Sequence, residues 1–267
     1  MSHTRSFRAS ALALAVLGAL VAGQAGATGF QLREQSVKNL GKSNAGSIVG
    51  KDASNVSLNP AAMTNLDKVT IQSDLTVIDL SASFSGGGSI LGSPAPSAAL
   101  TGGNGGEPGD PTLVPNLAAV FPMHGALEGM TLGASIGAPF GLKTEYEPGW
   151  VGRYRALTSD VKVVDLTLSA AFKATDGVSF GAGLVYERAD VTLSKAIGFG
   201  TAICASGNPA NCFNPQYPFK PQQLDGAFEV SGDSASLGYV VGAQIAPNDK
   251  LAIGFSHRSE IKHDLKG

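Results

Sequence analysis

Beyond its first residues the chain lacks any long apolar run. No stretch after residue 27 approaches the roughly 20 consecutive apolar residues that a membrane-spanning helix requires. This excludes an inner-membrane protein of the helical type. If the chain spans a membrane, it must do so as a closed β-barrel, because hydrocarbon offers no hydrogen-bond partners to backbone groups.

Aromatic side chains and basic charge are also scarce. Only 7% of the residues are aromatic, 35 of the 267 are glycine, and the formal net charge is −2. Without a basic excess we expect no nucleic-acid partner. No metal-ligand cluster, phosphate loop or paired carboxylate spacing stands out, so we expect no cofactor, no metal and no enzymatic activity.

The first residues are typical of an export signal. Arg5 and Arg8 precede an apolar run at 9–22, and Ala25-Gly26-Ala27 fits the small-x-small pattern of a cleavage site. We predict a signal peptide at 1–27, whose removal takes away two arginines and moves the net charge from −2 to −4. A retained anchor is the alternative, although the run is short for a bilayer.

Two cysteines, Cys204 and Cys212, lie in a segment rich in Pro, Asn and Gly. In an exported chain, this spacing favours a disulfide over two free thiols. A metal site is disfavoured because no histidine lies nearby.

Segments with apolar residues at every second position recur from about Val69 onward, which is the period of a β-strand with unlike faces. In 130–142 the even-numbered residues Met130 to Leu142, Phe140 included, share one predicted apolar face, opposite a small or polar one. We predict about seven strands, near 69–84, 112–122, 130–143, 157–173, 178–194, 226–246 and 251–267.

The predicted connections alternate strictly in length. Those at 123–129, 174–177 and 247–250 are short, while those at 85–111, 144–156 and 195–225 are long. This asymmetry is typical of transmembrane barrels, with tight periplasmic turns and long outer loops. A secreted β-sandwich would also alternate along its strands, but has no reason to place all its long loops at one end.

The segment from Thr28 to Lys68 shows no clear strand alternation. We predict that residues 28–68 form a hatch that folds into the lumen as a plug, and that 69–267 form part of a barrel wall. The alternative is a flexible periplasmic tail.

Four stretches together resemble one known family, and the resemblance covers essentially all of the chain after the signal peptide. The family is that of the FadL/TodX outer-membrane transporters. The stretches are Gly29-Phe30-Gln31-Leu32, Asp52-Ala53-Ser54-Asn55-Val56-Ser57-Leu58-Asn59-Pro60-Ala61-Ala62, Ala138-Pro139-Phe140-Gly141-Leu142-Lys143-Thr144-Glu145-Tyr146 and Gly149-Trp150-Val151-Gly152-Arg153-Tyr154.

The resemblance implies a 14-stranded transmembrane barrel with an N-terminal hatch, of which about seven strands are present here. It implies that Asn59, Pro60 and Ala61 are the hatch signature and that Phe30 lies near an interior substrate pocket. It also implies uptake of long-chain fatty acids or, in the TodX branch, of aromatic hydrocarbons. We expect a monomer in contact with outer-membrane lipid and lipopolysaccharide.

The resemblance further implies a kink in the third strand that opens a lateral gap. The residues support this independently, because Pro139 lacks a backbone N–H and is flanked by Gly137 and Gly141. A hydrophobic ligand could leave sideways through such a break. The alternative is a proline at an innocuous bulge or strand end.

The chain stops at Gly267, inside the predicted seventh strand, whereas chains of the family continue well beyond this point. Half a barrel would leave two unpaired strand edges in lipid. We therefore expect a fragment or a truncated product.

Several polar features carry weaker predictions. Gly133-Ala134-Ser135-Ile136-Gly137 matches the esterase pattern G-x-S-x-G, but it continues a strand and lacks a triad context. We interpret Glu187, Arg188 and Asp190 as solvated rim charges. Arg153 or Arg155 is a candidate for a carboxylate head group. Tyr146, Trp150 and Tyr154 fit either an interfacial girdle or local packing.

We therefore predict a transporter of hydrophobic compounds, with two alternatives. One is a surface protein such as an adhesin that uses the long loops. The other is a porin-like barrel, which would leave an open aqueous lumen.

Overall fold

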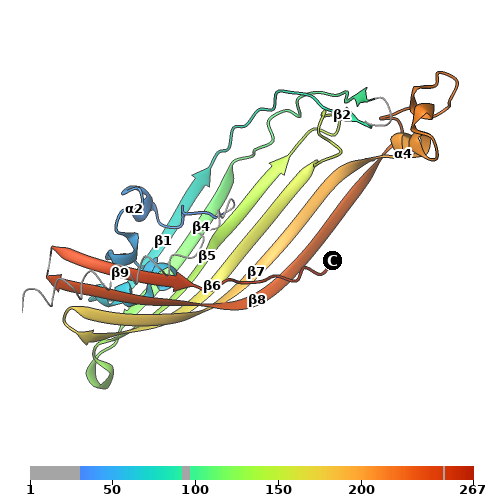
Figure 1. Cartoon of the computed structure of the whole chain (residues 1–267). Helices are drawn as coiled ribbons and strands as arrows, with labels where there is room; N and C mark the ends of the chain where they lie inside the picture. The colour runs from blue at the N-terminus through green and yellow to red at the C-terminus, as the bar shows by residue number, and fades with distance from the viewer. Residues whose placement is uncertain (1–30, 92–96, 249) are drawn as a thin grey trace, which may run out of the picture. The chain divides into compact units, whose positions relative to one another are not determined.

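An antiparallel sheet of seven strands dominates the computed structural model (Figure 1). The model describes residues 31–91, 97–248 and 250–267, so the predicted signal peptide lies outside the described residues. Within the described part, no helix is both long and apolar enough to cross a membrane. The sheet order is β1-β4-β5-β6-β7-β8-β9, with strands β1 (Thr70–Ile78), β4 (Thr112–Pro122), β5 (Met130–Glu145), β6 (Thr158–Thr175), β7 (Val178–Gly198), β8 (Asp225–Asn248) and β9 (Leu251–Arg258).

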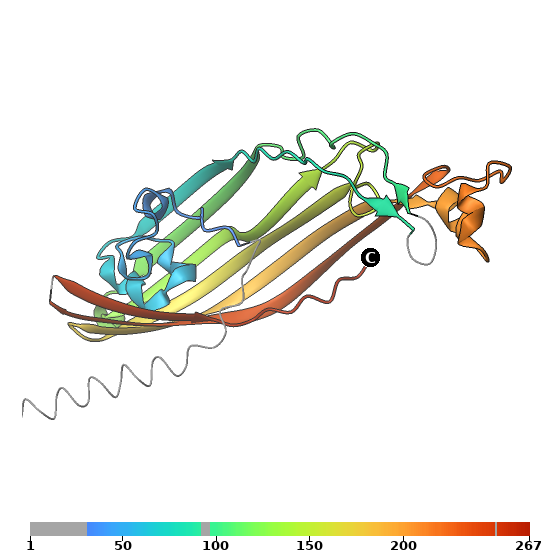
Figure 2. The ribbon, with the colours of Figure 1, turned by 45° about the horizontal axis from the view of Figure 1, so that its top comes forward.

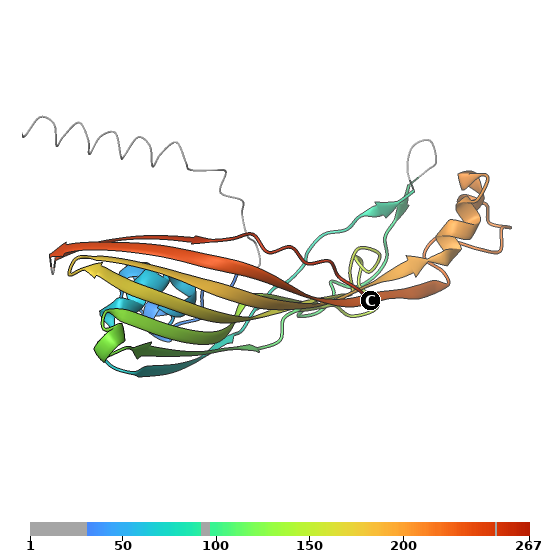
Figure 3. The ribbon, with the colours of Figure 1, turned by 90° about the horizontal axis from the view of Figure 1, so that it is seen from below.

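The two faces of this sheet differ as the alternation predicts. Along β7, Leu184 is 70% exposed while the next residue, Val185, is fully buried. Exposed apolar side chains such as Ile71 and Leu237 belong to the convex face, and small or polar ones to the concave face. The sheet curls around its concave face (Figure 3). The predicted all-β fold class is confirmed.

The connections follow the predicted alternation of short and long. Residues 123–129, with the short helix η3 (Gly125–Leu127), and the turn 176–177 join strands at one end, where β8 is also followed by β9. The long connections lie at the other end (Figure 1). They hold the strands β2 (Ser89–Ile90) and β3 (Ala98–Ala99) and the helices α4 (Phe199–Ala205) and η4 (Pro209–Phe213).

The first and last strands are shorter than predicted. β1 ends at Ile78, opposite Thr112, because the next partner residue would be Pro111, which has no N–H to donate. β9 ends at Arg258. Beyond it the chain still follows β8, but the Tyr239 N–H donates to the Ser259 side chain (3.0 Å) instead of a backbone carbonyl. The ladder is therefore irregular from 259 onward.

A segment of short helices, here called the hatch segment (residues 38–66), packs on the concave face near the short connections (Figure 2). It includes most of α2 (Val37–Leu40), η1 (Ser47–Val49), α3 (Asn55–Leu58) and η2 (Pro60–Asn65). Asn59 caps η2 by accepting a hydrogen bond from the Ala61 N–H (3.2 Å), and Pro60 occupies the first turn. Val56 and Met63 are fully buried in a core with Ala118 and Val120 of β4.

Candidate functional site

Strand β5 contains an irregularity where the kink was predicted. Gly137 is opposite Asp165 of β6, but Phe140 is opposite Val163, so β5 carries one residue more than β6 between these pairs. This is a β-bulge, which bends a strand and interrupts its ladder. Gly137 comes directly before it, Pro139 lies within it, and Gly141 follows it opposite Lys162.

The bulge also reverses the faces of β5. Before it, Ile136 is opposite Leu166, and both side chains belong to the convex face. After it, Phe140 and Leu142 are opposite Val163 and Val161, which alternate in phase with the buried Asp165. The prediction that Phe140 and Leu142 share a face with Met130 is therefore wrong, because one inserted residue shifts the period-two alternation.

Pairing between β4 and β5 stops at the same level. In the described chain, the ladder runs from Pro122↔Thr131 to Leu117↔Ile136 and no further. Yet β4 stays paired with β1 as far as Thr112, and β5 stays paired with β6 as far as Glu145. The two strands thus separate while their other neighbours hold them in place.

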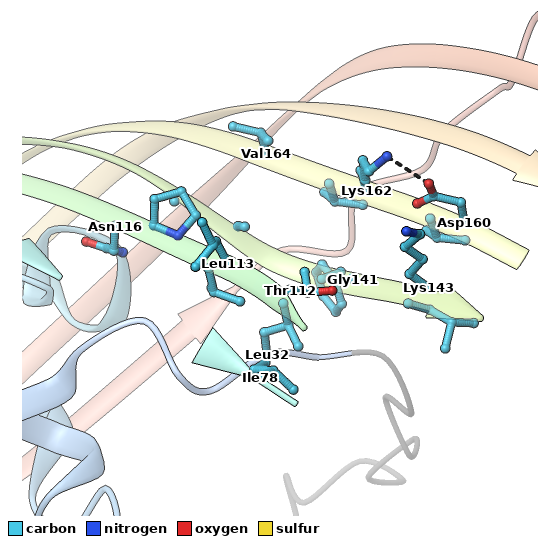
Figure 4. Close-up of a pocket in the computed structure, with 18 of the residues that line it drawn as sticks. Leu32, Ile78, Thr112, Leu113, Asn116, Gly141, Lys143, Asp160, Lys162 and Val164 are labelled. Atoms are coloured by element: carbon cyan, nitrogen blue, oxygen red, sulfur yellow. Dashed lines mark hydrogen bonds and ion pairs between the residues drawn. The ribbon is translucent and has the colours of Figure 1, made fainter. Parts of the chain in front are cut away.

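A cavity of about 540 Å³ occupies this separation (Figure 4). Its lining comes from both faces of the sheet and is mostly apolar. Leu113 and Ile136 of the convex face are 61% and 47% exposed, whereas Val114 and Val163 of the concave face are buried. We call it the wall cavity, because it lies in the sheet where β4 and β5 separate.

A short segment with a turn at 34–35, here called the strap (residues 32–37), lies behind the wall cavity. The Leu32 N–H donates to the Pro139 carbonyl (2.8 Å) within the bulge, and Asn116 Nδ2 of β4 donates to Gln35 Oε1 (3.1 Å). The strap then follows β1, where Thr76 Oγ1 donates to the Glu34 carbonyl (3.0 Å). The strap therefore bridges the separated strands on the concave side.

Next to the bulge, an ion network crosses the concave face. Arg258 of β9 donates to Asp165 of β6 (Nη1 to Oδ2, 2.9 Å) and to Glu187 of β7 (Nη2 to Oε2, 2.8 Å). Glu187 also contacts His263 Nε2 at 3.0 Å. Both carboxylates are buried. The interpretation of Glu187 as a rim charge is wrong, since it alternates in phase with the buried Val185 and Ala189.

Arg188 and Asp190 do lie on the exposed face, where Arg188 pairs with Asp190 at 3.4 Å and Asp233 at 3.3 Å. The alternation of β7 alone predicts this difference, because Glu187 occupies an odd-numbered position and Arg188 and Asp190 occupy even-numbered ones, on the opposite face.

The predicted hatch signature contacts the wall directly. Asn59 Nδ2 donates to the Ile48 carbonyl at 2.6 Å and approaches the Ala243 carbonyl of β8 at 3.4 Å. A Cβ at Gly242 would lie only 1.9 Å from Asn59 Oδ1, and one at Gly181 only 2.6 Å from the Ala61 nitrogen. Glycine at these two positions lets the signature approach the strands closely.

A polar network orders the hatch segment around Asp52, which is buried. Burial raises the pKa of this carboxyl, but hydrogen bonds from Ser54 and Ser36 outweigh it, so the pKa lies below its usual value. Asp52 is therefore a charged anchor of the hatch segment at neutral pH.

The long connections are tied together by Trp150 and Arg153, both buried. Trp150 stacks on Tyr146 with ring centroids 4.0 Å apart, so these aromatics pack locally instead of forming a girdle. Arg153 donates to Asp225 Oδ2 (2.8 Å) and to the Thr101 carbonyl (2.6 Å). Its guanidinium is thus occupied within the protein, which argues against a head-group role.

Tyr154 and the cysteines complete this end of the molecule. The Tyr154 hydroxyl donates to Asp225 Oδ1 (2.7 Å), and burial followed by this hydrogen bond raises the pKa of Tyr154 to about 12. Cys204 and Cys212 form a disulfide between α4 and η4.

Phe30 lies outside the described residues. Ser135 of the G-x-S-x-G pattern lies in β5 and is buried. Among the described residues, no group of three or more His, Cys, Asp or Glu side chains is arranged to hold a metal ion.

Comparison with known proteins places these features in context. Residues 18–267 match the family described as "Outer membrane protein transport protein (OMPP1/FadL/TodX)". The chain is 31% identical to the long-chain fatty acid transport protein of Escherichia coli O6:H1 and 32% identical to that of Salmonella typhi, in each case over 100% of this chain. It covers 57% and 58% of those two proteins.

Two further similarities extend the comparison. The chain is 29% identical to outer membrane protein P1 of Haemophilus influenzae over 98% of its length, covering 59% of that protein. The crystal structure of a Pseudomonas aeruginosa FadL homologue matches 88% of this chain and 54% of its own, with a TM-score of 0.69 at 24% identity. That likeness supports the fold.

Proposed function

This chain belongs to the OMPP1/FadL/TodX family of outer-membrane proteins, and we propose that it carries hydrophobic molecules across the outer membrane. In this proposal the transported molecule leaves the barrel sideways, through the wall cavity. Long-chain fatty acids are the ligands we propose first, because the relatives at 31% and 32% identity are named for their transport. Aromatic hydrocarbons are the second candidate, because they too could cross an apolar hollow of this kind.

The observation that carries this proposal is the wall cavity itself. A ligand that moves from the lumen into lipid needs a path with apolar lining on both faces of the wall, placed where no ladder closes it. The separation of β4 and β5 provides both conditions. In the proposed route, the ligand is captured by the outer loops, passes to a pocket behind the hatch, and exits after the strap shifts from the bulge. Residues 28–68 act as the plug, and a position of Phe30 near the pocket is part of this proposal.

Uptake by cells producing the full gene product tests the route. Each buried methylene contributes about 0.8 kcal/mol, so affinity should rise about fourfold per added methylene. No preference for longer acyl chains over polar solutes of similar size would contradict the proposal. A plugged barrel should conduct salt poorly and an open porin should conduct it freely, so salt conductance separates the two.

A thiol reagent tests the location of the exit. The described residues contain no free cysteine, so Leu113→Cys would be labelled specifically by a bulky maleimide. We expect labelling to block uptake, whereas the control Leu237→Cys, 76% exposed on the same face, should leave it unchanged. Equal effects at both positions would exclude exit at the wall cavity.

A further inference from the structure

Charged residues border the wall cavity at one end, where Figure 4 shows Lys143, Lys162 and Asp160 grouped together. Lys143 Nζ pairs with Asp110 Oδ2 at 3.0 Å, and Lys162 Nζ pairs with Asp160 Oδ2 at 2.7 Å. Among the described residues that line the hollow, these two lysines are the only cations. A ligand with an anionic head therefore has two candidate partners in the wall cavity, and both lie at this end.

The carboxylates of these two ion pairs differ in how easily they could leave. Asp160 lies on the same strand as Lys162, is opposite Lys143 in the ladder, and has a side chain that is 19% exposed. Asp110 belongs to the long connection before β4, and its side chain is 66% exposed. An exposed ion pair contributes little, because water solvates its members almost as well. Asp110 is therefore the carboxylate that is exchanged most easily for another anion.

Lys143 lies where the apolar lining ends. It follows Leu142 near the end of β5, on the half of the strand that pairs with β6 alone. Toward the bulge the lining is apolar, with Leu113 of β4 on one side of the separation and Phe140 of β5 on the other. A hollow of about 540 Å³ is within the size range of small-molecule sites. An amphiphile whose head contacts Lys143 would therefore place its tail between the two strands.

Building on the proposed function, we propose that Lys143 binds the carboxylate head of the ligand in the wall cavity, in exchange for Asp110. A carboxylic acid with a pKa of about 4 to 5 is almost fully ionised at pH 7, and an ammonium group donates charge-assisted hydrogen bonds to such an anion. One carboxylate replaces another at Lys143, while Asp110 turns into water. The favoured ligand is thus an anionic amphiphile, because an aromatic hydrocarbon gains nothing from this lysine.

The test compares two probes with the same tail, a sixteen-carbon fatty acid that carries a diazirine near the end of its chain and the methyl ester of that acid. Only the acid is charged. Each probe is titrated against the full gene product in vesicles and irradiated, and its affinity is taken from the yield of adducts on peptides containing Leu113 and Phe140. We expect Lys143→Met to weaken binding of the acid roughly three- to tenfold and to leave the ester unchanged.

Removing the competing carboxylate should have the opposite effect. Asp110→Asn leaves Lys143 without its partner, so we expect the acid to bind roughly two- to fivefold more tightly, again with no change for the ester. Because Asp110 is exposed in a connection, this variant decides the question even if Lys143→Met fails to fold. Lys143→Arg keeps the charge and should retain most of the acid binding. Lys173→Gln is the control, since Lys173 is exposed at the other end of β6 and does not line the wall cavity.

The two variants separate ligand binding from a purely structural ion pair. A structural pair would make both variants bind both probes less well. That result, or unchanged binding of the acid in Lys143→Met, would overturn the role of Lys143 and leave the proposed function standing. A wild-type protein that binds the ester as tightly as the acid would do the same. A wild-type protein that forms adducts with neither probe in the wall cavity would overturn the proposed function, and the role of Lys143 with it.

Discussion

The two halves of β5 show how one strand can both close a wall and open it. Its first half, 130–136, is paired from Thr131 onward with β4 and throughout with β6, and the buried hatch segment packs on its concave side. Its second half, 137–145, is paired with β6 alone, has reversed faces, and borders the wall cavity. A single inserted residue separates the two halves. Whether β5 pairs with β4 to close the wall therefore depends on the register of the strand more than on its amino-acid composition.

The largest expected effect concerns the junction between the halves. Arg258→Met would leave Asp165 and Glu187 buried without their cation, and breaking such a network costs about 3 kcal/mol or more. We expect the folded protein to unfold at a clearly lower temperature, measured by its heat-modifiable shift in gel mobility. Arg258→Lys should recover part of it, and wild-type stability of Arg258→Met would mean that the network does not support the bulge.

A second substitution addresses the closed side of the wall. Gly242→Val would place side-chain atoms where Asn59 now lies, and overpacking of this kind costs about 1 to 3 kcal/mol. We expect lower thermal stability together with a higher salt conductance as the hatch segment is displaced. Ala235→Val, on the exposed face of the same strand, is the control. Unchanged conductance in Gly242→Val would argue that the hatch segment does not occlude the lumen.

Removing the inserted residue would make the two halves alike. Deletion of Ala138 should restore one register along β5 and let it pair with β4 beyond Ile136. We expect fatty-acid uptake to fall at least about tenfold, equivalent to roughly 1.4 kcal/mol, with stability maintained. Pro139→Ala keeps the chain length and should be milder. Normal uptake by the deletion variant would separate the bulge from transport.

The smallest effect is expected in the long connections, at the end of the sheet where Tyr154 lies. Because the pKa of Tyr154 is raised from 10 to about 12, folding favours its protonated form. The stability it contributes is therefore present below pH 10 and is lost as the pH rises from 10 to 12. Tyr154→Phe should show less loop loosening over this interval, measured by proteolysis. Identical profiles would show that the hydrogen bond to Asp225 contributes nothing.

The sequence predicts the structure of the first half of β5 (130–136) better than that of the second half (137–145). Alternation and loop lengths predict the strands of the wall, since a continuous ladder follows its hydrophobic pattern closely. Alternation could not reveal the face reversal at Phe140 and Leu142, because apolar residues continue on even positions through the bulge. Pro139 predicted the place of the break. It did not predict the partner strand that separates, which depends on where the β4 ladder ends.

Other parts of the site depend on contacts distant in sequence. Glu187 resembles a surface charge until Arg258, 71 residues away, is brought against it. Arg153 resembles a free cation until its bond to Asp225, 72 residues away, is seen.

Photo-crosslinking tests the central idea most directly. A long-chain fatty acid with a diazirine near the end of its tail is bound to the full gene product in vesicles, irradiated, and its adducts are mapped by mass spectrometry. We predict adducts on both sides of the wall cavity, in peptides containing Leu113 and Phe140, and their loss on deletion of Ala138. Adducts confined to the outer loops, or unaffected by the deletion, would contradict lateral passage between β4 and β5.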